Sequence, residues 1–240
     1  MNFKYLFKQE LFKELPQSVF CYWISAKLLD SFKNNKEIGE TSRSVSGVST
    51  GDNDRFMRLW FEVSLPKITF DCCSQNDFNS HSCHYVPCNK GGEFRKWYGN
   101  NFYVIKWDES NEFHRNRNTY NDLFFISGIT WSAITTNNFN ARYYPKGFVF
   151  DHASPSLFPL HPEQIYFYLG LLNSNVVSGI LKMINPTINT GADSLQRVPI
   201  CFDATITEDI GRLVIQNIEN AKKDWDSFET SWDFKRHPLI

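Results

Sequence analysis

The hydrophobic period changes twice along this chain, and these changes constrain its fold more than any single motif does. Apolar residues recur at helical spacing before Ile38 and again after Pro159, whereas short apolar segments separated by polar turns fill the region between them. Helical spacing is typical of amphipathic helices, and short apolar segments between turn residues are typical of strands. The sequence therefore predicts an α+β fold with a β-rich central body and flanking helices.

Capping and turn residues set the expected ends of these elements. Ser18, Ser174 and Thr207 are placed to cap helices, Pro16 is placed to end one and Pro162 to start one. The predicted helices cover residues 3–15, 18–35, 162–172, 174–184 and the segment from Thr207 onward. The predicted strands cover residues 57–63, 102–107, 123–126, 129–134, 148–150 and 198–202.

The segment Asn89–Asn101, here called the contact loop, is suited to touching a partner. Two adjacent glycines allow a sharp turn, and the residues after them supply cations and amphipathic rings. Arginine and lysine bind phosphates or guanine edges, and aromatic rings stack or lie along sugars. The candidate contacts are Lys90, Arg95, Lys96, Trp97 and Tyr98. A β-turn with a solvated charged face and a half-buried tryptophan fits the same residues, and both interpretations stay open.

The charge balance limits how such a loop meets nucleic acid. The chain carries 25 Lys and Arg against 26 Asp and Glu, so its formal net charge is -1. This balance argues against a purely electrostatic nucleic-acid binder but allows a local basic face. Residues 203–233 hold 8 acidic residues against Arg212, Lys222 and Lys223. We therefore do not expect this end of the chain to face phosphates.

Cysteine usage and missing motifs narrow the function further. Six cysteines occur without a signal peptide or regular disulfide spacing, which predicts a reduced, cytoplasmic protein. No apolar run approaches the roughly 20 residues of a membrane span, so no membrane partner is expected. Cys83 and Cys88 approach zinc spacing but lack a second pair, so no metal site is predicted, although residues 72–88 leave that question open. P-loop and nucleophile-elbow motifs are missing, and no catalytic residue is predicted.

Four segments, in one order along the chain, resemble the target-recognition region of the PglX family. These are the adenine-specific DNA methyltransferases of BREX phage-defence systems, related to type IIG and IIL enzymes. The four segments are residues 20–25, 49–58, 89–100 and 224–232. A looser similarity links residues 130–134, 141–143, 169–173 and 185–189 to specificity domains of the TaqI and type I restriction classes. That similarity implies a curved sheet with helices that holds the DNA.

The resemblance implies a recognition segment without its catalytic domain. An adenine-N6 methyltransferase needs a glycine-rich loop for S-adenosylmethionine and an Asn/Asp-Pro-Pro-aromatic tetrad for the flipped adenine. Neither occurs here, because Asn185-Pro186-Thr187 lacks the second proline and the ring. We expect no enzyme activity and no cofactor in this chain, with S-adenosylmethionine bound by a missing catalytic domain. A start within a helix and an end soon after Pro238 favour a fragment.

On this basis we divide the chain into a helical lead-in (1–36), a target-recognition domain (37–203) and a truncated C-terminal helical segment (204–240). The expected function is recognition of a duplex DNA sequence for a site-specific adenine-N6 methyltransferase domain in cis or in trans. Asparagine suits adenine and arginine suits guanine. Beyond the contact loop, the candidate DNA contacts are therefore Asn53, Arg55, Arg58, Arg115, Arg117, Asn138 and Arg142. The alternative is a protein-interaction module that docks other subunits of the defence complex.

Overall fold

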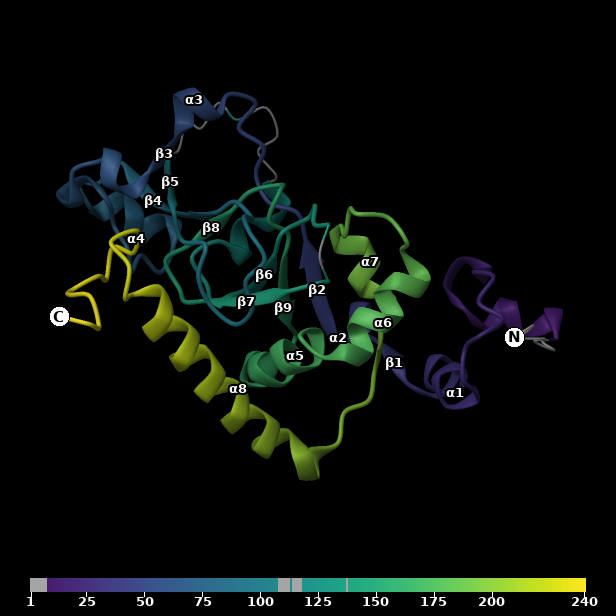
Figure 1. Ribbon diagram of the computed structural model, residues 1–240. Helices are drawn as coiled ribbons and strands as arrows, with labels where there is room; N and C mark the ends of the chain where they lie inside the picture. The colour runs from purple at the N-terminus through teal and green to yellow at the C-terminus, as the bar shows by residue number, and fades with distance from the viewer. Residues whose placement is uncertain (1–7, 108–112, 114–117, 137) are drawn as a thin grey trace.

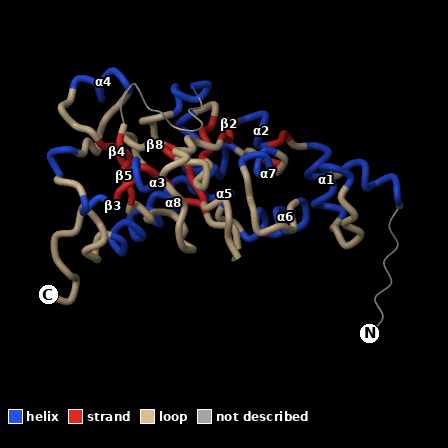
Figure 2. The backbone as a smooth tube through the Cα atoms, turned by 90° about the horizontal axis from the view of Figure 1, so that it is seen from above, coloured by secondary structure: helices blue, strands red, loops and turns tan. Residues whose placement is uncertain are grey.

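The computed structural model describes residues 8–107, 113, 118–136 and 138–240. Helices and short strands mix along the chain, and the strands form three sheets with helices around them (Figure 1). The predicted α+β class is confirmed. Seen from above, the strands occupy the middle of the molecule, with the N-terminal helical part at one end and the C-terminal tail at the other (Figure 2).

Two four-stranded sheets form the centre. The first is antiparallel, in the order β2 (Ser42–Val45), β9 (Ser156–Pro159), β6 (Gly128–Trp131) and β7 (Ala141–Tyr144). The second has the order β3 (Met57–Leu59), β5 (Tyr103–Lys106), β4 (Tyr85–Asn89) and β8 (Val149–Phe150), and only the β4–β8 pair is parallel. A two-stranded sheet joins β1 (Lys36–Glu37) to β10 (Pro199–Ile200). The strands thus divide between separate sheets, where we expected one curved sheet.

A glycine turn separates the two larger sheets. β7 belongs to the first sheet and β8 to the second, and Gly147 between them has a φ of +95°. A Cβ atom at Gly147 would lie 2.2 Å from a backbone carbonyl oxygen, that of Phe70, so the turn requires glycine. An isolated bridge between Val48, after β2, and Asp151, after β8, ties the two sheets together again.

Four α-helices follow β9, with β10 between the third and the fourth. They are α5 (Ile165–Leu172), α6 (Asn175–Ile184), α7 (Ala192–Gln196) and α8 (Ala204–Trp225). The Ser174 side chain accepts a hydrogen bond from the Val177 amide at 3.2 Å and caps α6 as predicted. Asp203, and not Thr207, caps α8, since it accepts from the Thr205 amide at 2.9 Å. Among the described residues, no single helix is long and apolar enough to cross a membrane; residues 162–172 and 175–184 meet that test only as a pair bent by 75°.

The N-terminal part differs from the two helices that the spacing predicts. Residues 9–14 form a 3-10 helix (η1), residues 16–18 form another (η2), and the α-helix α1 begins only at Ala26 and ends at Asn34. Ser25, and not Ser18, caps α1, because its side chain accepts from the Leu28 amide at 3.2 Å. A turn from Cys21 to Ile24 precedes this cap and interrupts the expected helix. Residues 1–7 lie outside the described residues.

The remaining elements are short. They are α2 (Ile38–Thr41), α3 (Asn53–Phe56), η3 (Trp60–Glu62), η4 (Leu65–Lys67), α4 (Gln75–Ser80), η5 (Asn118–Leu123) and η6 (Pro162–Gln164). The strand predicted over 57–63 stops at Leu59, because the Glu62 carboxylate accepts from the Leu59 amide at 2.8 Å and closes a helical turn. The strand predicted over 123–126 is also wrong. Phe125 has a φ of 68°, which a regular strand does not allow.

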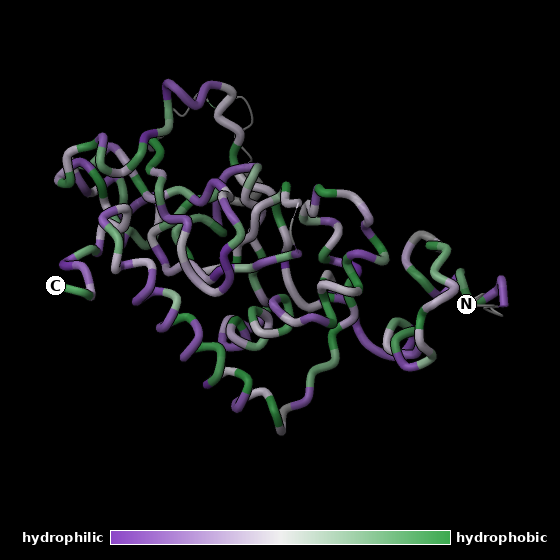
Figure 3. The backbone as a smooth tube through the Cα atoms, viewed as in Figure 1, coloured by the Kyte–Doolittle hydropathy of each residue, from purple (hydrophilic) through white to green (hydrophobic). Residues whose placement is uncertain are grey.

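Two clusters of buried side chains make the core. One surrounds the second sheet and is rich in aromatic rings, among them Trp107, Phe124, Phe125 and Phe150. The other fills the space between the first sheet and the C-terminal helices and includes Trp131, Leu169 and Val214. α8 lies against α5, and hydrophobic and hydrophilic residues alternate along it (Figure 3). At their contact, a Cβ on Gly170 would lie 2.9 Å from the Val214 side chain.

Candidate nucleic-acid interface

The contact loop begins with a glycine turn at the end of β4. Gly91 and Gly92 have φ values of 79° and 130°, and a Cβ atom on Gly92 would lie 2.9 Å from the Asn100 amide nitrogen. That amide donates to the Glu93 carbonyl oxygen at 2.9 Å. The Ser132 hydroxyl donates to the Gly92 carbonyl oxygen at 2.9 Å. The loop is therefore folded onto itself and onto the end of β6.

Two predicted contacts in the middle of the loop are bound within the protein. The Arg95 guanidinium pairs with the Asp224 carboxylate at 2.9 Å and lies 5.1 Å from the centre of the Trp225 ring. The Lys96 ammonium donates to the Asn173 carbonyl oxygen at 2.9 Å, at the C-terminal end of α5. A cation at that position is stabilised by the helix dipole. Arg95 and Lys96 thus fasten the contact loop to α8 and α5.

The two aromatic candidates, Trp97 and Tyr98, also make contacts within the protein. The half-buried Trp97 pairs with β7, since its amide donates to the Ala141 carbonyl oxygen at 2.9 Å. Tyr98 is 5% exposed, with the Lys222 ammonium 5.3 Å from its ring centre. Burial raises the pKa of Tyr98 to about 12. A side chain so enclosed does not lie along DNA, so Tyr98 leaves the candidate set.

Arg142, predicted as a DNA contact, is also buried. It lies on β7 and is 2% exposed, and its Nη1 donates to the Asn140 side-chain oxygen at 3.1 Å. Burial is the main cause that lowers its pKa to about 10. Its Nε has no hydrogen-bond partner among the described residues. A guanidinium enclosed in this way meets no DNA unless β7 moves.

Lys90 lies at the opposite end of the contact loop. Its ammonium is 2.9 Å from the Met57 sulfur and 5.4 Å from the centre of the Tyr103 ring. The Asp151 carboxyl is close enough to interact with this charge and is 8% exposed. Burial raises the pKa of Asp151 to about 6, and the positive Lys90 opposes that rise. Lys90 therefore lies beside β3, β5 and the residue that follows β8.

The α3 turn carries the second predicted set. Asp52 caps α3 by accepting from the Arg55 amide at 3.0 Å, and the exposed Arg55 guanidinium lies 4.8 Å from the Phe56 ring centre. The Asn53 side chain accepts from the Thr50 hydroxyl at 2.7 Å. Arg58 donates to the carbonyl oxygen of Met57 at 2.6 Å and to that of Asp54. Met57, which directly follows α3, is also the residue that the Lys90 ammonium contacts, so Lys90 lies next to the end of α3.

Among the remaining predicted contacts, the structure describes Asn138. Asn138 is exposed on the loop after β6, and its carbonyl oxygen accepts from the Asn140 amide at 3.4 Å. The Asn140 side-chain oxygen accepts from the backbone amide of Arg95, in the contact loop, at 3.5 Å. Arg115 and Arg117 lie outside the described residues.

Two adjoining hollows lie near the start of the contact loop, and Lys90 lines one of them. One has a volume of about 230 Å³ and is lined by the contact-loop glycines, Lys90 and Ile134. The other has a volume of about 290 Å³ and is lined in part by Ser44 and Asp193. Both are bounded by Ala133, His152 and Asn189. We did not predict Ile134, His152 or Asn189, although the looser similarity covers residues 130–134 and 185–189.

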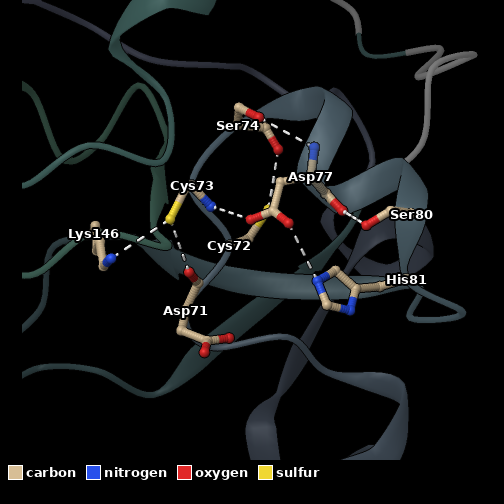
Figure 4. A network of polar contacts seen from close by, with 8 residues as sticks. All are labelled: Asp71, Cys72, Cys73, Ser74, Asp77, Ser80, His81 and Lys146. Atoms are coloured by element: carbon tan, nitrogen blue, oxygen red, sulfur yellow. Dashed lines mark hydrogen bonds and ion pairs between the residues drawn. The ribbon is translucent and has the colours of Figure 1, made fainter.

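The cysteine-rich segment forms a polar network at the start of α4 (Figure 4). The Asp77 carboxylate accepts from the Cys73 amide at 2.7 Å, which lowers the pKa of Asp77, and it lies 3.5 Å from the His81 ring. The Lys146 ammonium is 3.5 Å from the Cys73 sulfur. All six cysteines are free. Over the described ranges, no three His, Cys, Asp or Glu side chains are grouped to hold a metal ion.

Comparison with known proteins places these features in context. No protein-family model matches the chain. It is 34% identical over 252 residues to the adenine-specific methyltransferase PglX of Lacticaseibacillus casei (strain Zhang), across 100% of this chain and 21% of the relative. The chain is homologous to adenine-specific methyltransferases. The methyltransferase BrxX of Escherichia coli O9:H4 (strain HS) is also 34% identical, over 238 residues, across 97% of this chain and 19% of the relative. The chain spans about a fifth of these relatives.

Proposed function

We propose that this chain is the segment of a PglX-type, BREX phage-defence methyltransferase that recognises the duplex DNA sequence to be methylated. The observation that carries the proposal is homology along the whole chain to one fifth of adenine-specific methyltransferases. The sequence lacks the adenine-binding tetrad and the cofactor loop. Catalysis and S-adenosylmethionine then belong to another part of the enzyme, in cis or in trans, and the complex acts on DNA in the cytoplasm.

The surface that we assign to DNA is narrower than the set predicted from sequence. It consists of Lys90, Asn53 and Arg55 on α3, Arg58 on β3, the hollow that Lys90 lines and the hollow adjoining it. Cations there suit phosphates, and the polar groups around the hollows suit base edges. Arg95 and Lys96 are not assigned to DNA, because their charged groups fasten the contact loop to α8 and α5.

Binding to a randomised duplex pool across a salt series tests the proposal. The 240-residue chain is expected to enrich a short motif, with affinity that falls steeply as salt rises. The double variant Lys90→Ala/Arg55→Ala should weaken binding to all sequences and reduce the slope of log affinity against log salt by about 2. Lys182→Ala, at an exposed cation on α6, is the matched control and should leave that slope unchanged. Loss of binding without a change in slope would contradict the assignment.

The apolar side of α8 favours a second candidate function, docking of another subunit of the defence complex. Ile206 and Leu213 are exposed on α8, and Phe202 is exposed just before it. Asp209, three residues after Ile206 and four before Leu213, lies on the same side of α8 and suits a partner helix with a basic residue beside its apolar face. The variant Ile206→Ser/Leu213→Ser should then lose binding to purified defence subunits and keep DNA affinity. Retained subunit binding would exclude this side of α8.

A further inference from the structure

Two loops far apart in the sequence pair with each other beside Lys90. One follows β6, the other follows α6, and we call residues 133–135 and 188–190 the paired loops. Ile134 stands opposite Asn189 in an antiparallel bridge. The Thr135 amide donates to the Ile188 carbonyl oxygen at 3.0 Å, and the Thr190 amide donates to the Ala133 carbonyl oxygen at 2.7 Å. The paired loops are thus a short two-stranded ribbon.

Hydrogen bonds from neighbouring parts of the fold hold the backbone of the ribbon in place. The buried Trp131 donates through its indole nitrogen to the Thr190 carbonyl oxygen at 2.8 Å. The Ala133 amide donates to the Ala153 carbonyl oxygen at 2.9 Å. The Asn185 side-chain amide donates to the Asn189 carbonyl oxygen at 2.8 Å and so fixes the second loop. All of these bonds use the backbone of the ribbon, and they leave its outward side chains available for a ligand.

The outward pair combines an apolar and an amide side chain. Ile134 is 67% exposed, and Asn189 is also exposed. Within the described residues, the Asn189 side-chain amide makes no hydrogen bond. Residues directly opposite in an antiparallel pair project to the same face, with Cβ atoms about 5 Å apart. Both side chains line the hollow that Lys90 also lines.

This combination matches one kind of base pair. In the major groove, an A·T pair presents adenine N6 and N7, which suit an asparagine amide, beside the thymine methyl group, which suits an apolar side chain. That groove also admits a two-stranded ribbon. Lys90, at the other side of the hollow, suits a backbone phosphate.

We infer that the Ile134–Asn189 pair reads an A·T base pair in the major groove of duplex DNA while Lys90 binds a neighbouring phosphate. The inference rests on the proposed function, since it assigns the base-reading residues of the same surface. Asn189 accepts from adenine N6 and donates to adenine N7, and Ile134 covers the thymine methyl group. Ile188 belongs to the same ribbon but lies outside the hollow and takes no part in reading.

The experiment compares the 240-residue chain with Asn189→Ala and Ile134→Ala in selection from a randomised duplex pool. Ile188→Ala, which removes a second exposed isoleucine from the same ribbon, is the matched control. The motif selected by the wild-type chain is then resynthesised with deoxyuridine for thymine, which removes only the methyl group, or with 7-deazaadenine for adenine, which removes N7. Thermal melting of each variant confirms that it is folded.

The expected result is an A·T position that the wild-type chain and Ile188→Ala require and that the other two variants do not. Deoxyuridine at that position should weaken wild-type binding on the order of tenfold and leave Ile134→Ala unchanged. 7-Deazaadenine at that position should weaken wild-type binding to a similar extent and leave the binding of Asn189→Ala unchanged. A folded variant that selects the unaltered motif overturns the inference and leaves the proposed function standing. A wild-type chain that binds DNA without a motif overturns the inference, and one that binds no DNA overturns both.

Discussion

Replacing Asp151 by asparagine should stabilise the fold, and the effect should depend on pH. Asp151 follows β8 and is 8% exposed, and burial raises its pKa from 3.8 to about 6. Between about pH 4 and pH 6, the folded protein therefore binds more protons than the unfolded chain does. Stability falls as pH rises through this window, and the full cost of the buried charge is present at neutral pH.

The size of the effect follows from that shift. A rise from 3.8 to about 6 corresponds to about 3 kcal/mol of unfolding free energy, as an upper value. The attraction of Lys90, which asparagine loses, is already contained in the shift. The Oδ1 atom that accepts from the Ala153 amide at 2.8 Å is kept in asparagine. We therefore expect Asp151→Asn to gain about 1–3 kcal/mol above about pH 7 and almost nothing near pH 4.

Urea unfolding of both proteins at several pH values measures this difference. Asp122→Asn is the control of opposite sign, because a hydrogen bond from Arg43 lowers the pKa of Asp122 at the surface. Its small effect should be a loss of stability at neutral pH that disappears in acid. An Asp151→Asn gain that is equal at all pH values, or a loss at neutral pH, would refute the reasoning about buried charge.

Two further predictions concern packing. Trp225→Ala should lower the free energy of unfolding by about 3–5 kcal/mol in urea titration, since Trp225 is 4% exposed and holds Arg95 and the contact loop; Phe228→Ala, at an exposed ring nearby, should change it little. Gly47→Ala should lower the melting temperature sharply, because the new Cβ atom would lie 1.8 Å from the Phe150 carbonyl oxygen. Gly179→Ala, inside α6 with open space around it, should raise the melting temperature slightly, and equal effects of the two changes would contradict the packing argument.

Local signals in the sequence were the most reliable. The Ser174 cap is confirmed because its bond closes within three residues, at Val177. The caps at Ser18 and Thr207 failed for a related reason. Ser25 and Asp203 also bond to amides two or three residues ahead, and the sequence did not indicate which of the neighbouring caps each helix would use. Packing outside the segment decides between such alternatives.

The candidate site depended on contacts that no local pattern contains. The contact loop was recognised from its glycines and cations, but the partner of Arg95 lies on α8, 129 residues further along the chain. The acidic C-terminal segment, which we did not expect to face phosphates, supplies the carboxylate that holds this arginine. Ile134 and Asn189 face each other only because two loops from different parts of the fold pair. The spacing of residues within one segment does not indicate such a pairing.

The way the paired loops are supported makes their two outward positions exchangeable. The bonds from Trp131 and Asn185 reach backbone carbonyl oxygens of the ribbon, so they do not depend on which side chains occupy positions 134 and 189. Substitutions there change a ligand-facing surface without removing an anchor. A library randomised at positions 134 and 189 alone would therefore retain the fold in most of its members, and altered sequence preference would be sought within a few hundred protein variants.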